Sequence, residues 1–232
     1  MHTENMALVQ GWADTRSTLR RWSLRPGRAL LPWSIGSLSI AALLLTVTWV
    51  IANHTTPDPG MVYFPGLAYT STLGDFGFIL YRNGLVLALH GFACIAGFMA
   101  GSSLPQVAKG YSGVWRWVHD KAGPLAIAFV VAATLFSLIT QAWALGSAAS
   151  SLSAKLDVSP GVLLLGLSLH AIPELFALFL PLAAWTLAAR RKAWNELLAA
   201  TFVTVAIAIP IIVAAAAIEA WVSPRLLLAL AG

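Results

Sequence analysis

Two residues that can exchange protons lie within one long apolar run. The stretch LSLHAIPELFALFLPL, residues 167–182, places His170, Pro173 and Glu174 within five positions. On a helix, residues four apart share a face and lie one turn apart. A proline inside such a helix removes a backbone hydrogen bond and introduces a kink. Imidazole and carboxyl groups can act as general acids and bases, so His170 and Glu174 are catalytic candidates.

Four more polar side chains interrupt other apolar runs, and they are Arg82, Asn83, His90 and Glu219. Ionisable side chains inside a membrane are costly and mark functional sites by default. One hypothesis is a Zn²⁺ site formed by His90, His170 and Glu174, with Glu219 or water completing it. Another is activation of water by Glu174 without a metal. The sequence contains no HExxH zinc motif and no GxSxG serine motif, which argues against those two hydrolase classes.

The chain that carries these groups has the composition of a membrane protein. Of its 232 residues, 59% are hydrophobic and 10% are charged, and its mean hydropathy is +0.79. Backbone groups in hydrocarbon must pair internally, and no alternating barrel pattern is visible, so we expect helices. Five apolar runs are long enough to span a bilayer, at about residues 31–52, 76–101, 124–145, 161–189 and 196–222. The predicted fold is an all-α polytopic membrane protein.

The predicted spans divide the chain into three parts. Residues 1–30 form a basic amphipathic arm, residues 31–225 form the transmembrane domain, and residues 226–232 form a short apolar tail. In the arm, Leu8, Trp12, Thr15, Leu19 and Trp22 recur at helical spacing, which predicts an interfacial helix on an anionic membrane face. The alternative for the arm is a disordered basic tail.

The distribution of basic residues predicts the orientation in the membrane. Eleven Lys and Arg residues fall in the arm and in the connections at 102–123 and 190–192. Lys155 and Arg225 fall on the other side. The positive-inside rule then places the N-terminus in the cytoplasm and the C-terminus outside a bacterial cell membrane. The net charge of +5 is thus explained by the topology and by attraction to anionic lipid. It does not require a nucleic-acid partner.

The same orientation gathers the ionisable residues of the spans in one half of the membrane. Counted along the predicted helices, Arg82, His90, His170, Glu174 and Glu219 all fall between the midplane and the outer surface. We therefore predict a polar pocket that opens to the outside. Three interpretations are open: a buried network with Arg82 paired to Glu219 and Glu174 protonated or bonded to His170, a catalytic site, or a transport or proton-coupling site.

Three stretches resemble the stage II sporulation protein M-like membrane family. They are YRNGLVLALHGFACIAGF, LHAIPELFALFLPLAAW and IVAAAAIEAWVSP, within residues 76–225. The family pattern carries over onto Asn83, His170, Glu174, Glu219 and Pro224. The chain departs from the pattern after His170, where Ala171 stands in place of the usual glycine.

The resemblance implies two kinds of role. One branch of the family belongs to a peptidoglycan-remodelling complex of spore engulfment. Other members accompany ribosomally synthesised peptides, including circular bacteriocins, in leader removal, cyclisation or immunity. The chain would then work with a precursor peptide, with membrane lipid, and within a homo-oligomer or an export complex. Gly97, Ala100 and Gly101 could make a close helix contact, within one chain or between chains.

The resulting hypothesis is an intramembrane peptidase-like enzyme that matures a precursor peptide. Glu174 would be the general base or a metal ligand, and His170 and His90 would be ligands or proton shuttles. Glu219 and Arg82 would orient the peptide or each other, and Glu219 is also a catalytic candidate. The Asn83 amide could polarise a carbonyl group. The alternative is a non-enzymatic membrane scaffold, export or immunity protein.

Overall fold

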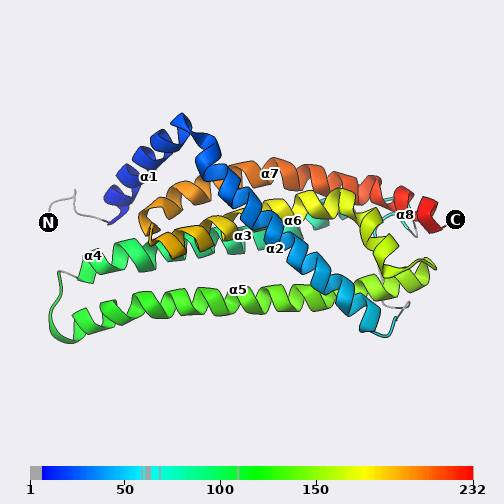
Figure 1. Cartoon of the computed structure of the whole chain (residues 1–232), viewed down its shortest axis with the longest axis horizontal. Helices are drawn as coiled ribbons and strands as arrows, with labels where there is room; N and C mark the ends of the chain where they lie inside the picture. The colour runs from blue at the N-terminus through cyan, green and yellow to red at the C-terminus, as the bar shows by residue number, and fades with distance from the viewer. Residues whose placement is uncertain (1–6, 59, 61–63, 68, 109, 232) are drawn as a thin grey trace. The chain divides into compact units, whose positions relative to one another are not determined.

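The computed structural model describes residues 7–58, 60, 64–67, 69–108 and 110–231, and most of these residues lie in helices (Figure 1). The elements, in chain order, are α1 (Ala7–Leu24), α2 (Pro26–His54), α3 (Leu73–Phe98), the π-helical turn η3 (Met99–Ser103), α4 (Leu104–Ala108), α5 (Gly113–Lys155), α6 (Pro160–Arg191), the 3₁₀ turn η4 (Trp194–Glu196), α7 (Leu197–Trp221) and α8 (Ser223–Ala231). No strand occurs in these ranges. The predicted all-α class is confirmed.

Five helical segments are long and apolar enough to cross a membrane. They are Pro26–His54, Leu73–Ser103, Gly113–Lys155, Pro160–Arg191 and Trp194–Trp221. Each contains a window with a mean hydropathy between 1.8 and 2.6. The five predicted spans are confirmed, and the chain is built as a multi-pass membrane protein.

The third span differs most from its predicted bounds. The sequence pattern placed its start at Pro124, but α5 begins at Gly113 and continues through Pro124. Much of the connection predicted at 102–123 is therefore helical. Within this helix, Gly123 approaches α3's continuation closely, since a Cβ atom there would lie 2.8 Å from the carbonyl oxygen of Ala100. Hydropathy marks only the part of a helix that faces hydrocarbon, so it misses the polar extension.

Contacts within the chain group the residues into two units. Unit 1 contains Met1–Ser37, Leu87–Thr134 and Phe179–Ile207, and unit 2 contains Leu38–Val86, Leu135–Leu178 and Ala208–Gly232. Each of the five spans contributes one part to each unit. Unit 1 contains 11 of the 14 Lys and Arg residues, whereas unit 2 contains five of the nine Asp and Glu residues.

In unit 1, helix α1 packs through small residues. Thr15 and Thr18 are buried, and Gly11 approaches Phe98 so closely that a Cβ would lie 2.8 Å from its ring. Trp12, by contrast, is 73% exposed. The predicted helix is confirmed. Trp12 takes no part in this packing, and the membrane-facing role of its side of the helix stays a prediction. The side chain of Leu8 lies outside the described residues.

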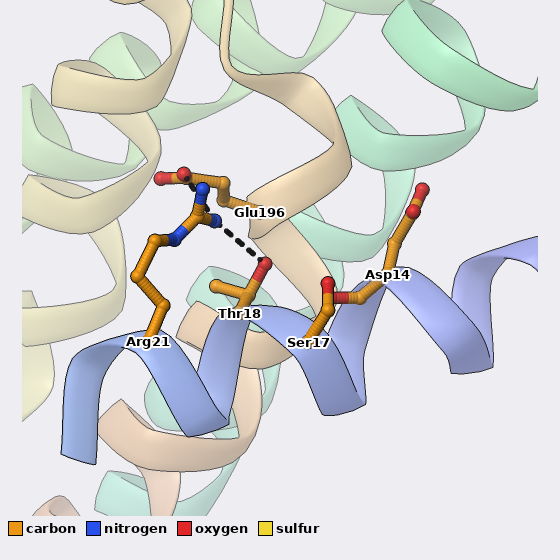
Figure 2. Close-up of polar contacts among 5 residues, drawn as sticks. All are labelled: Asp14, Ser17, Thr18, Arg21 and Glu196. Carbon is orange, nitrogen blue, oxygen red and sulfur yellow. Dashed lines mark hydrogen bonds and ion pairs between the residues drawn. The ribbon is translucent and has the colours of Figure 1, made fainter. Parts of the chain in front are cut away.

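A charged pair ties α1 to η4 (Figure 2). Arg21 Nη2 lies 3.0 Å from Glu196 Oε1 and also donates to Thr18 Oγ1 at 3.1 Å. The Arg21 side chain is 61% exposed, so solvent screens the pair and its contribution to stability is about 0–1 kcal/mol.

Gly97 and Gly101, which the sequence predicts to make a close helix contact, lie in unit 1. A Cβ at Gly97 would lie 2.6 Å from the indole nitrogen of Trp185, and Gly101 faces Trp194. The close contact is therefore made within the chain. Cys94 lies nearby, fully buried, and its thiol donates to the Pro181 carbonyl at 3.3 Å.

In unit 2, helices α2 and α5 approach closely. A Cβ at Gly146 would lie 2.5 Å from the Cγ2 atom of Ile51. Ser150 Oγ donates to the Thr55 carbonyl at 2.7 Å. One apolar core cluster of this unit contains Ala52, Ala149, Leu152, Leu163 and Leu227. Because Leu227 belongs to α8, the short C-terminal helix is anchored in the core of unit 2.

Candidate functional site

Glu174, on α6, is the centre of the candidate site in unit 2. Its carboxyl group lies beside the Asn83 side chain of α3 and interacts electrostatically with Glu219 of α7 and Arg82 of α3. Glu219 interacts with Arg82 as well. Three helices thus bring together four of the residues that the sequence singled out.

Two atoms at this centre are buried without a hydrogen-bond partner. They are Oε2 of Glu174 and Nδ2 of Asn83. The Asn83 side chain lies within hydrogen-bonding reach of the Glu174 carboxyl group, although these two atoms make no hydrogen bond of good geometry. Most buried polar groups in proteins are paired, and an unpaired one calls for a functional or structural explanation.

Arg82 lies at the exposed side of this cluster. Its guanidinium group lies 5.8 Å from the centre of the Phe78 ring, in cation–π geometry. Among the described residues, the ion pair with a distance of 4.0 Å or less is the one between Arg21 and Glu196. Arg82 and Glu219 do not form such a pair, so the expected Arg82–Glu219 pair is wrong. A long charged side chain in a membrane span can direct its charge toward the interface.

His170 is bound to α8 and not to Glu174. Its Nδ1 atom lies 2.7 Å from Oγ of Ser223, and both residues are buried. The interpretation that joined His170 to Glu174 is therefore wrong, although both residues lie on α6 as predicted. Residues one turn apart share a helix face, but each side chain contacts the neighbouring helix that lies at its own height along the face.

Ser223 is the residue that the sequence analysis missed. It opens α8, immediately before Pro224. Serine followed by proline after a helix end is a typical start of a new helix. That signal could have identified a short helix after α7, but it could not have identified His170 as the partner.

His90 lies in unit 1, where it is fully buried and its ring lies 5.7 Å from the ring of Phe179. Within the described residues, no group of three or more His, Cys, Asp or Glu side chains could hold a metal ion. His170 already uses Nδ1 for Ser223. The geometry thus gives no support to the expected zinc ligands His90, His170 and Glu174.

Unit 2 contains an apolar cavity of about 310 Å³ between α2 and α5, lined by residues such as Leu44, Ile51 and Trp143. Unit 1 contains a smaller one of about 20 Å³, which Trp22 and Trp33 help to line. Neither of these two cavities is lined by Glu174 or Asn83. The outward-opening polar pocket therefore stays a prediction.

Comparisons of the chain with family models, with curated proteins and with solved structures give no match.

Proposed function

We propose that the chain is a membrane-embedded peptidase-like enzyme that cleaves a ribosomally synthesised precursor peptide. The observation that carries the proposal is the pair of interacting carboxyl groups, Glu174 and Glu219, in which one Glu174 oxygen is buried without a partner. Two carboxyl groups in one site can supply a general base and a general acid.

In the proposed reaction, Glu174 removes a proton from water while the water oxygen attacks the carbonyl carbon of a peptide bond. The C–N bond then breaks, and the leaving nitrogen takes a proton from Glu219. The products are a carboxyl group and an amine, so the reaction consumes one water and needs no oxidant or metal. General acid–base catalysis of this kind contributes about 10²–10⁴-fold to a rate.

Arg82 is the proposed substrate-binding residue. Its guanidinium group is exposed and interacts with both carboxyl groups without forming an ion pair with either. A cation in this position can attract an anionic group of the peptide, such as a carboxylate. His170 has a positioning role, because its bond to Ser223 links α6, which carries Glu174, to α8.

The distribution of charge supports the proposed orientation. Unit 1 contains most of the basic residues, which favours the cytoplasm for the N-terminus, with the C-terminus outside a bacterial cell membrane. Glu174, Glu219, Asn83 and Arg82 all belong to unit 2. A peptide would then meet the site from the outer side. A peptide is the substrate class that the proposed kinship with the stage II sporulation protein M-like family implies.

The proposal is tested by cleavage in proteoliposomes. The full chain is reconstituted with a precursor peptide encoded beside its gene, and products are identified by mass spectrometry. Glu174→Gln and Glu219→Gln each lose cleavage by about 10²-fold or more. Glu196→Gln is the matched control, because Glu196 pairs with Arg21 in unit 1 and keeps the wild-type rate. Wild-type cleavage by both site variants would overturn the proposal.

A second candidate, a non-enzymatic scaffold, export or immunity protein, is favoured by one observation. Glu174 Oε2 and Asn83 Nδ2 are shut off from the surface, so a peptide reaches them only if the surrounding helices separate. In a scaffold, the same Gln variants lower stability or assembly and have no cleavage to lose. Thermal unfolding measured beside the cleavage assay distinguishes the two functions.

A further inference from the structure

Helix α1 is fixed to the rest of unit 1 through one of its faces. A Cβ at Gly11 would lie 2.8 Å from the Phe98 ring and 3.2 Å from a methyl carbon of Leu198. Thr15 and Thr18 lie further along the same face, and both are buried. Protein contacts therefore occupy this face of α1, and the other side of the helix is left for a different partner.

These contacts place α1 beside the ends of two membrane spans. Phe98 lies in the last turns of the second span, and Leu198 lies in the first turns of the fifth. Arg21 adds its bond to Glu196, at 3.0 Å, at the start of the fifth span (Figure 2). A helix rises about 1.5 Å per residue, and each interfacial layer of a bilayer is about 5–7 Å deep. The contacts thus hold α1 at the depth of the interface between hydrocarbon and water.

The side of α1 that faces away from the protein contact carries a row of exposed residues. Trp12, Arg16, Arg20 and Leu24 follow one another at intervals of four residues, so they lie along one side of the helix. Trp12 is 73% exposed and Leu24 is 79% exposed. The row thus has two arginines between two large apolar side chains. This combination is typical of helices that lie in the plane of a membrane interface.

The charge around this row is strongly positive. Glu196 already pairs with Arg21, and the acidic residue within α1 is the half-buried Asp14. Further exposed cations of unit 1 follow α1 or directly precede η4, and they are Arg25, Arg28, Arg190, Arg191 and Lys192. Several basic residues beside a membrane span attract phospholipids that have negative headgroups.

Two features favour a phospholipid over a water-soluble anion as the partner of this row. A guanidinium group matches the oxygens of a phosphate group and can donate two hydrogen bonds to it. Trp12 and Leu24 are stabilised by contact with the apolar part of the interface. A soluble anion would use the arginines alone and leave the two apolar side chains in water.

We propose that Arg16 and Arg20 bind the phosphate groups of anionic phospholipids. Trp12 and Leu24 contact the adjoining acyl chains. The lipid-facing side therefore differs from the one that the sequence pattern indicated, because Thr15 of that pattern is buried against protein and the arginines lie in one row with Trp12. The proposal is independent of the proposed function, whose residues belong to unit 2.

The test is native mass spectrometry of the full chain, titrated in detergent with dioleoylphosphatidylglycerol or dioleoylphosphatidylcholine. Wild type is expected to bind phosphatidylglycerol more tightly. Arg16→Gln combined with Arg20→Gln lowers that affinity by about fivefold for each arginine, which is the contribution of one cation near an anionic lipid surface. Binding of phosphatidylcholine stays unchanged. Arg16→Lys combined with Arg20→Lys keeps most of the affinity, because the charge is retained.

Lys155→Gln combined with Arg225→Gln is the matched control, because it removes the same net charge from exposed positions of unit 2. This control is expected to keep the wild-type preference. An equal loss in the control, or wild-type affinity after both arginines of the row are replaced by glutamine, overturns the proposal. Glycerol phosphate, which has the anionic group without acyl chains, is expected not to displace phosphatidylglycerol at the same concentration. Displacement would show a site for a soluble phosphate and would overturn the assignment to lipid.

Discussion

His170 Nδ1 and Ser223 Oγ lie 2.7 Å apart and join α6 to α8 within the buried part of unit 2. This bond ties the helix that carries Glu174 to the helix that follows Glu219. It also explains why α8, which has only nine residues, is held in place at the end of the chain. The bond positions the site without belonging to its reacting groups.

Ser223→Ala should lower the free energy of unfolding by about 1–3 kcal/mol, because it leaves a buried imidazole nitrogen without its partner. The measurement is denaturant or thermal unfolding of the purified chain in detergent. Ser168→Ala is the matched control on α6, since Ser168 bonds only the Leu165 carbonyl of its own helix. Equal stability of the two variants would show that the bond to His170 contributes nothing.

Gly146→Ala should destabilise the chain, because the new methyl group would lie 2.5 Å from Ile51 across the α2–α5 contact. Overpacking of this kind costs about 1–3 kcal/mol. Gly84→Ala on α3 is the control, since nothing lies within 4 Å of a Cβ there, and alanine favours a helix by up to about 1 kcal/mol. The prediction fails if Gly146→Ala is as stable as Gly84→Ala in the same unfolding assay.

Arg21 and Glu196 should show a weak coupling that depends on salt. A double-mutant cycle with Arg21→Met and Glu196→Gln is expected to give about 0.2–1 kcal/mol at low ionic strength and less at high salt. The reason is that 61% of the Arg21 side chain is exposed. A coupling that is large and unaffected by salt would contradict this account of the α1–η4 contact.

The proposed orientation predicts from which side of the membrane a reagent can label a single introduced cysteine. Lys155→Cys should react with a membrane-impermeant maleimide on intact cells, whereas Asn195→Cys should react only after permeabilisation. Both positions are exposed, and the native Cys94 is fully buried, so it gives no background. Labelling of Asn195→Cys from outside would reverse the orientation.

The helices themselves could be predicted from local patterns. The apolar runs identified five spans, and the spacing in the arm identified α1, because length and periodicity act within a single segment. The partners of the polar residues depended on packing between segments that lie far apart in the sequence. The depth of polar residues along the predicted spans indicated that Glu174, Glu219 and Arg82 belong together. It also placed His90 and His170 with them, and the structure was needed to show that His90 lies beside Phe179 and that His170 binds Ser223.

The same limit applies to the protein contacts of α1. A helical stripe of large apolar residues indicates a face that avoids water, but it does not distinguish contact with protein from contact with lipid. In the structure, Gly11, Thr15 and Thr18 make the close protein contact and Trp12 remains exposed. Helices that approach closely need small side chains at the contact.

The most direct test of the central claim is the turnover of a reconstituted precursor peptide by the Glu174→Gln variant at saturating peptide. Glutamine keeps the size and the polarity of the side chain but cannot accept the proton of water. The account predicts that kcat falls by about 10²–10⁴-fold while thermal stability and peptide binding stay at wild-type levels. Wild-type kcat in a folded Glu174→Gln variant would contradict it.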